Sequence, residues 1–148
     1  MPSRLSSRAA GQHGFTLLEI MVVIFIIGLL IAIVAPNVLS NQDDAMQQKA
    51  RADISTLEQA LDMYRLDNYR YPTTQQGLEA LVSEPSQAPQ PKNYRADGYI
   101  RRLPEDPWGH PYQYRSPGEH GSVDIFSLGA DNATGGEDTD TDIGNWML

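Results

Sequence analysis

The sequence contains no cysteine among its 148 residues. This absence excludes disulfide bonds, thiolate chemistry and cysteine-ligated zinc, but it does not fix the compartment, because oxidising compartments permit disulfides without requiring them. Positive charge is also scarce: 11 Lys and Arg residues stand against 19 Asp and Glu, for a formal net charge of -8. Such a surface repels nucleic acid, so nucleic acid is not an expected partner.

Catalytic signatures are missing as well. The three histidines, His13, His110 and His120, show no metal-ligand spacing. A membrane-tethered hydrolase would need a nucleophile with an oriented base, yet the sequence has no nucleophile-elbow motif and no convincing Ser-His-Asp grouping. We therefore expect a protein that is not an enzyme. Its length leaves room for one modest globular domain.

One long apolar segment, Phe15 to Ala35, dominates the N-terminal part. As a helix it would extend roughly 32 Å, close to the thickness of a bilayer's hydrocarbon core. Arg4 and Arg8 precede it and predict a cytoplasmic N-terminus. A secretory signal cut after Ala35 is one alternative, but the apolar run is longer than a usual signal core. A plain uncleaved anchor is the other.

Glu19 is the residue that a plain anchor leaves unexplained. A carboxylate inside a membrane helix costs roughly 2.5–3.5 kcal/mol on insertion scales, and less near the interface. Opposite charges attract far more strongly in an apolar environment than in water. The position therefore predicts a cationic partner for Glu19.

The segment from Gly14 to Glu19, GFTLLE, resembles the processing site of type IV pilin-like proteins. The resemblance implies that a prepilin peptidase cuts between Gly14 and Phe15 and methylates the new N-terminal nitrogen of Phe15. It also implies a role for Glu19, the fifth residue after the cut, in assembly. There it would neutralise the N-terminal ammonium group while subunits are recruited.

Beyond Ala35 the pattern stays helical and becomes amphipathic. The apolar residues are spaced by three or four and share one face: Met46, Ala50, Ile54, Leu57, Leu61 and Tyr64. Pro36 would remove one helical hydrogen bond and marks a kink or a boundary. We predict one continuous, bent helix from about Phe15 to Asp67.

The remaining chain predicts a small sheet. Thr73 or Thr74 is expected to cap a short second helix with Leu78, Leu81 and Val82 turned inward, and the proline-rich stretch 83–92 predicts a surface loop. Residues 111–115 and 123–128 alternate apolar and polar side chains around a turn-rich segment, which indicates an antiparallel hairpin. The expected fold class is α+β, a long N-terminal helix packed on a small antiparallel sheet.

Four further segments resemble the major pseudopilins of type II secretion systems: 71–78 (YPTTQQGL), 103–112 (LPEDPWGHPY), 127–131 (SLGAD) and 142–146 (DIGNW). The resemblance implies a pilin-like subunit that polymerises into a periplasmic filament, the pseudopilus, which supports export of folded proteins across the outer membrane. The implied partners are other copies of the chain, other pseudopilins, inner-membrane assembly proteins, prepilin peptidase and, before assembly, membrane lipid. A type IV pilus subunit for adhesion or motility is the alternative, which the absence of a C-terminal cysteine pair disfavours.

The C-terminal segment is strongly acidic. Between Gly129 and Gly144 the chain has five carboxylates and no Lys or Arg: Asp131, Glu137, Asp138, Asp140 and Asp142. Oxygen-only ligands in a flexible loop suit Ca²⁺ better than Mg²⁺. The pattern is not an EF-hand, and a merely solvated acidic loop is the alternative.

The pseudopilin resemblance favours a structural calcium in this loop. It implies the Leu128 carbonyl, Asp131 and Asp142 as ligands. Some members have a second aspartate before the isoleucine, where this chain has Thr141. Asp140 is expected to take that place, with Glu137 or a loop carbonyl as further alternatives.

These patterns predict four parts of the chain. They are a cytoplasmic leader that the peptidase removes (1–14), a transmembrane and assembly helix (15–35), its amphipathic continuation (36–67) and a periplasmic globular domain (68–148). The expected location is the inner membrane, crossed once, with the filament in the periplasm.

Overall fold

The computed structural model describes residues 14–148, and for residues 34–41 it describes the backbone alone. Helix α1 covers Leu17–Asn68. The later elements are the 3-10 helix η1 (Leu78–Leu81), strand β1 (Gln113–Arg115), strand β2 (Asp124–Ser127), the 3-10 helix η2 (Asp138–Asp140), strand β3 (Ile143–Gly144) and the 3-10 helix η3 (Asn145–Met147). The chain divides into two compact units with the boundary between Ser40 and Asn41. The α+β class is confirmed.

Helix α1 begins and ends close to the predicted residues. The Thr16 hydroxyl accepts the Glu19 N–H at 3.1 Å, which caps the helix N-terminus. At the other end the Tyr69 N–H donates to the Arg65 carbonyl at 2.7 Å, and Tyr69 itself has a positive φ of 62°. The helix continues through Pro36, as predicted. The bend expected there stays a prediction.

The sheet is antiparallel, with the strand order β1-β2-β3. Its first two strands confirm the predicted hairpin but are shorter than 111–115 and 123–128. One reason is Pro111, which has no N–H for a ladder and forms only an isolated bridge with Glu105. Strand β3 was not predicted. It pairs Ile143 with Ser127, so that the C-terminal segment completes the sheet.

The predicted second helix is reduced to a single 3-10 turn. Thr73 and Gln76 exchange two hydrogen bonds, at 3.0 and 3.2 Å, and so close the turn before it. Gly77 then adopts a φ of 63°, which interrupts any helix that starts at Thr73. The predicted threonine cap was therefore wrong, because the N-cap of η1 is Gly77 and no side chain caps it, and the predicted helix is only a 3-10 turn. Leu78 and Leu81 are buried as expected, and Val82 is half-buried.

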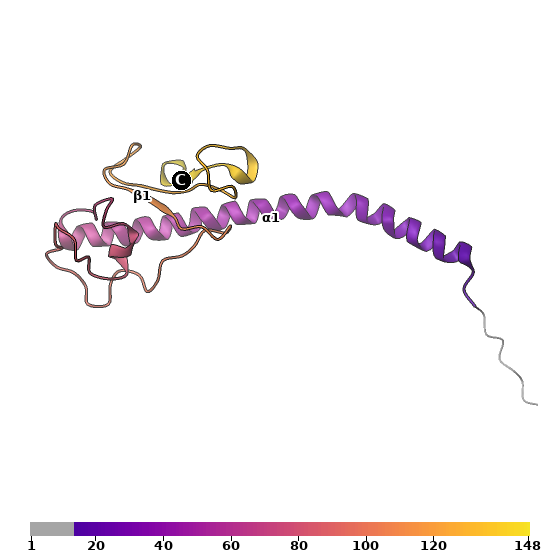
Figure 1. The fold of residues 1–148 in the computed structure, drawn as a ribbon, viewed down its shortest axis with the longest axis horizontal. Coiled ribbons are helices and arrows are strands. Elements are labelled where there is room, and N and C mark those ends of the chain that lie inside the picture. The colour runs from indigo at the N-terminus through magenta and orange to yellow at the C-terminus, as the bar shows by residue number, and fades with distance from the viewer. Residues whose placement is uncertain (1–13) are drawn as a thin grey trace, which may run out of the picture. The chain divides into compact units, whose positions relative to one another are not determined.

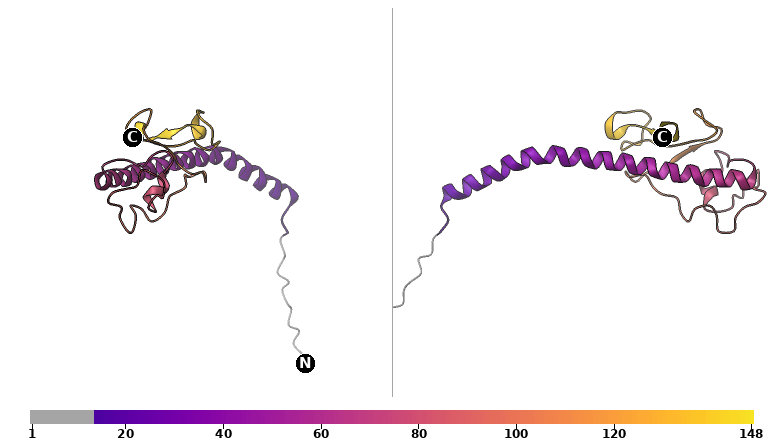
Figure 2. Two further views of the ribbon diagram at one scale, coloured as in Figure 1. Left: turned by 60° about the vertical axis from the view of Figure 1, so that its left-hand side comes forward. Right: turned by 180° about the vertical axis from the view of Figure 1, so that it is seen from behind.

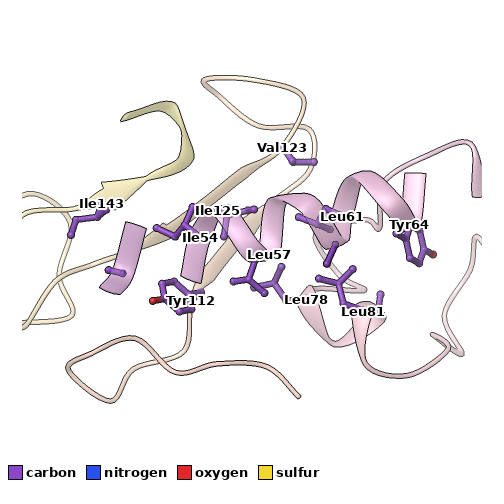
Figure 3. Close-up of a cluster of buried hydrophobic side chains, with 13 residues drawn as sticks. Ile54, Leu57, Leu61, Tyr64, Leu78, Leu81, Tyr112, Val123, Ile125 and Ile143 are labelled. Carbon is purple, nitrogen blue, oxygen red and sulfur yellow. The ribbon is translucent and has the colours of Figure 1, made fainter. Parts of the chain in front are cut away.

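The core lies along the second half of α1. Five of the six predicted stripe residues are at most 1% exposed, namely Ala50, Ile54, Leu57, Leu61 and Tyr64, and Met46 is half-buried. Figure 3 shows this stripe between side chains of the sheet and those of η1. In Figures 1 and 2 the sheet lies on one side of this part of α1 and η1 on another. The second half of α1 is thus the centre of the globular unit.

Three tyrosines join the end of α1 to the loop after residue 91. The ring of Tyr64 lies 5.2 Å from that of Tyr99 and 6.3 Å from that of Tyr94, in tilted and edge-on arrangements. Asn68 donates from its amide to the Tyr99 hydroxyl at 2.9 Å and accepts the Asn93 N–H at 2.9 Å. These contacts fix an otherwise irregular loop against the helix.

Candidate functional site

The residues predicted to direct processing and assembly lie at the start of α1. Gly14 precedes the helix, and a Cβ added there would meet no atom within 4 Å. Phe15 is 80% exposed, and Glu19 is exposed in the first helical turn. The peptide bond between Gly14 and Phe15 is therefore accessible in the described chain. The predicted leader lies outside the described residues apart from Gly14.

The position of Glu19 in the helix suggests a second, local role that the sequence analysis missed. Thr16 is the N-cap and Glu19 is the third helical residue, which is the spacing of a capping box. The positive end of the helix dipole also favours a carboxylate in this turn. Glu19 therefore has two candidate roles, a local one at the helix terminus and a partner for a cation supplied at assembly.

The described N-terminal part of α1, up to Ile33, packs on no apolar core. Every large apolar side chain from Phe15 to Ile33 is exposed, the least exposed at 46%. Within the described residues, none of the helices has an apolar stretch long enough to cross a membrane. The predicted span from Phe15 to Ala35 includes residues whose side chains lie outside the described part, and it stays a prediction.

The acidic loop places two of its segments side by side. The Ala130 N–H donates to the Thr139 carbonyl at 3.0 Å. Gly129 has a φ of 70°, and a Cβ there would come within 2.6 Å of the Asp140 carbonyl carbon. Only glycine allows this approach between the two backbones. The segment that begins with Leu128 therefore packs against the segment that carries Asp140 and Asp142.

The predicted calcium ligands are distributed over these segments. Asp131 is exposed, and its Oδ1 accepts the Ala133 N–H at 3.0 Å. Asp142 is half-buried, and its Oδ2 accepts the Gly135 N–H at 3.0 Å. Asp142 Oδ1 is buried and has no hydrogen-bond partner among the described residues. An unpaired buried carboxylate oxygen is costly, and a cation would satisfy it.

The carboxylates are nevertheless not gathered into one centre. In the part of the chain that the structure describes, no three Asp, Glu or His side chains form a group that could hold a metal ion. Asp140 is half-buried, and the Leu128 carbonyl lies on the adjoining segment. The ligand set of Leu128, Asp131, Asp140 and Asp142 therefore stays a prediction.

Asp106, a buried carboxylate outside the acidic loop, is linked by hydrogen bonds to the first residues of that loop. The side chain of Asp106 is fully buried and accepts hydrogen bonds from the Trp108 N–H at 3.1 Å, the His110 N–H at 2.7 Å and the Ser127 hydroxyl at 2.6 Å. The Ser127 oxygen in turn accepts the Gly129 N–H at 3.2 Å. The Asp-Pro-Trp-Gly sequence signals the local turn. No sequence signal indicates the bond to Ser127, which lies 21 residues away.

Asp124 closes the loop between β1 and β2. It accepts the Glu119 N–H at 2.7 Å and lies 3.2 Å from both the backbone nitrogen and Nδ1 of His120. Burial alone would raise the pKa of Asp124, but these hydrogen bonds outweigh it and lower the pKa. The His120 ring stacks on Trp146 at 3.9 Å, which ties this loop to the C-terminal segment.

Two family profiles match this chain. The profile described as "Type II secretion system (T2SS), protein G" matches residues 37–146. The profile described as "Prokaryotic N-terminal methylation motif" matches residues 10–35, which include the predicted processing site. Together they match residues in both compact units.

Named relatives are similar over nearly the whole chain. The type II secretion system core protein G of Aeromonas hydrophila is 61% identical over 93% of this chain and 94% of its own length. That of Vibrio cholerae is 62% identical over 93% of both chains. The crystal structure of the major pseudopilin from the type 2 secretion system of enterohaemorrhagic Escherichia coli superposes with a TM-score of 0.69 at 58% identity. It corresponds to 76% of this chain and 96% of the crystallised chain.

Proposed function

The chain belongs to the type II secretion system protein G family and is a pseudopilus subunit, and we propose that its copies polymerise into a periplasmic filament supporting export of folded proteins across the outer membrane. The observation that carries this proposal is the exposure of the apolar side chains in the N-terminal part of α1. The large apolar side chains from Phe15 to Ile33 are all exposed and need an apolar partner, either lipid or other subunits. The globular unit has its own core and needs no such cover.

Processing precedes assembly in this proposal. Prepilin peptidase cuts between Gly14 and Phe15 and methylates Phe15, which agrees with the match of residues 10–35 to the methylation motif. The cytoplasmic leader is lost, and the rest stays anchored in the inner membrane by a single span with the globular domain in the periplasm. Glu19 then neutralises the Phe15 ammonium of a subunit during recruitment.

The acidic loop is proposed to hold a structural Ca²⁺. The Leu128 carbonyl and the carboxylates of Asp131, Asp140 and Asp142 would be its ligands, and the cation would neutralise their mutual repulsion. Support comes from the buried Oδ1 of Asp142, which has no hydrogen-bond partner in the described part of the chain, and from the close packing of the two segments that carry these residues. The donor set consists entirely of oxygen, as Ca²⁺ prefers.

The protein G family is a family of structural secretion components, and we expect no catalytic activity from this chain. Its membership implies assembly with other pseudopilins and contact with prepilin peptidase. Inner-membrane assembly proteins and, before assembly, lipid complete the proposed set of partners. The net charge of -8 gives no reason to expect nucleic acid among them.

Deletion of the gene, followed by two separate assays, tests the proposal. We expect exoproteins to accumulate in the periplasm while surface pili and motility remain. Complementation with the wild-type chain should restore release. Loss of surface pili with normal exoprotein release would instead identify a type IV pilus subunit, which shares the leader and the apolar helix.

A further inference from the structure

Asp106 and Ser127 connect two parts of the molecule that have no common element. Asp106 belongs to the turn between residues 103 and 112, whereas Ser127 ends β2 and leads directly into the acidic loop. Neither is a predicted calcium ligand. We propose that both are positioning residues for the calcium loop, holding the Leu128 carbonyl and the Asp140 segment in place. This inference rests on the calcium site of the proposed function.

The direction of the hydrogen bonds supports this role. Asp106 accepts two backbone N–H groups and the Ser127 hydroxyl, so the Ser127 proton points toward Asp106. The lone pairs of the Ser127 oxygen are then free to accept the Gly129 N–H. Both side chains are fully buried, so water does not compete for these bonds.

Gly129 transmits this constraint to the ligand segments. Its N–H is fixed by Ser127, and its Cα packs directly against the Asp140 backbone. The next residue, Ala130, pairs with Thr139 at 3.0 Å. Leu128 lies between Ser127 and Gly129, so its carbonyl is oriented by residues held on both sides. Residues that orient metal ligands without binding the metal themselves commonly influence metal affinity.

The competing explanation is that Asp106 only closes its own turn. Its bonds to Trp108 and His110 would suffice for that purpose. Two substitutions separate the explanations. Ser127→Ala keeps both turn bonds but leaves the Gly129 N–H without its acceptor. Asp106→Asn retains one acceptor oxygen for the turn and replaces the oxygen that faces Ser127 by a donor NH₂ group, which competes for the Ser127 lone pairs.

Calcium titration of the full-length protein in detergent micelles, by isothermal calorimetry, tests the proposal. We expect Ser127→Ala and Asp106→Asn each to weaken calcium binding by about tenfold or more. Tyr114→Phe is the matched control, because it also deletes a hydroxyl hydrogen bond, to the Pro72 carbonyl at 2.8 Å. This control should change the calcium Kd by less than about twofold, since the Tyr114 hydroxyl bonds to Pro72 and to no residue of the acidic loop.

Amide hydrogen exchange without calcium supplies a second, metal-independent reading. Ser127→Ala should accelerate exchange at Gly129, Ala130 and Asp140 and leave the Tyr99 and Ile100 amides, which donate to Leu81, unchanged. Wild-type Kd values in both variants would overturn the positioning role. If the wild-type chain bound no calcium, the calcium site itself would fail. The exchange data alone would then show whether Ser127 positions the loop, and unchanged exchange at Gly129 in Ser127→Ala would contradict that role.

Discussion

The two halves of α1 belong to one helix but differ in what covers their apolar side chains. From Phe15 to Ile33 every large apolar residue is exposed, whereas from Ala50 to Tyr64 the apolar stripe is almost completely buried. The second half obtains its cover from η1 and the sheet of the same chain. No such cover is present for the residues from Phe15 to Ile33 among the described residues, and in the proposed function it comes from lipid or from other copies. In that proposal, folding depends mainly on the second half and assembly on the first.

The largest expected effect is the loss of leader removal when Gly14 is replaced. In the proposed processing, prepilin peptidase must approach the bond after Gly14 closely, so the bulkier side chain of Gly14→Val should leave essentially all of the chain with its leader attached, as measured by mass spectrometry. A Cβ at this position meets no atom within 4 Å, so the substitution should not disturb the fold. Gly28→Val, also in open space within the described residues, is the control and should be processed normally. Efficient production of a chain beginning at methylated Phe15 would contradict the prediction.

Glu19 separates assembly from helix capping. Glu19→Val should leave cleavage and membrane insertion intact, because it removes a polar group from an apolar helix, but it should abolish filament crosslinking and exoprotein release. Glu19→Gln distinguishes the two roles of this residue. Gln serves equally well in a capping box but has no charge for the Phe15 ammonium. Assembly by the Gln variant would assign Glu19 to the helix terminus alone.

Truncating one leucine in each half tests the comparison directly. Leu57 is 1% exposed, so Leu57→Ala should lower the unfolding free energy of the globular unit by about 2–5 kcal/mol. Leu30 is 58% exposed, so Leu30→Ala should change it by less than about 0.5 kcal/mol. Guanidinium unfolding in detergent, followed by tryptophan fluorescence, measures both. Equal losses would show that the two halves are stabilised together.

Much of the fold could be predicted because its signals are local. The three-to-four spacing predicted the buried face of α1, and the alternation around residues 116–121 predicted the β1–β2 hairpin. Strand β3 was missed because it contains only Ile143 and Gly144, too short a run for any periodicity. Its pairing with β2 joins residues far apart in the sequence and depends on the packing of Ile143 in the core.

The functional residues divide in the same way. Gly14, Phe15 and Glu19 form a contiguous motif that sequence analysis could recognise. The bond from Ser127 to Asp106 joins two separate motifs, and its geometry depends on the fold of both. Acidic composition indicated a cation at the C-terminal loop. It could not distinguish the Asp142 oxygen, which is buried and has no hydrogen-bond partner among the described residues, from the exposed side chain of Asp138.

Calcium removal should destabilise only the globular unit. At a free calcium concentration of a hundred times Kd, binding adds about 2.7 kcal/mol to the unfolding free energy, so a chelator should lower the melting temperature of the full-length protein. Calcium should restore it better than magnesium. Asp131→Ala or Asp142→Ala should remove most of this response, whereas the matched Asp138→Ala, at an exposed residue, should retain it. Unchanged melting and protease sensitivity after chelation would leave only a solvated acidic loop.

The smallest expected effect on the unfolding free energy at neutral pH concerns the tyrosines on and around the second half of α1. Burial raises the pKa of Tyr94 to about 12 and also raises the pKa values of Tyr64, Tyr99, Tyr112 and Tyr114. An unfolded chain releases these protons near pH 10, whereas the folded chain retains them. The stabilisation is therefore complete below pH 10 and is lost as the pH rises through the folded pKa values. Each tyrosine contributes a slope of up to about 1.4 kcal/mol per pH unit.

Tyr94→Phe isolates one of these contributions. The Tyr94 hydroxyl is buried without a hydrogen-bond partner among the described residues, so its removal should not lower the unfolding free energy at pH 8. Between pH 10 and pH 11 the variant should lose less stability than the wild type, as measured by guanidinium unfolding at each pH. An identical alkaline slope in the two proteins would show that Tyr94 ionises equally easily in the folded and unfolded chains. The contact of its ring with Tyr64 would then not shield the hydroxyl from water.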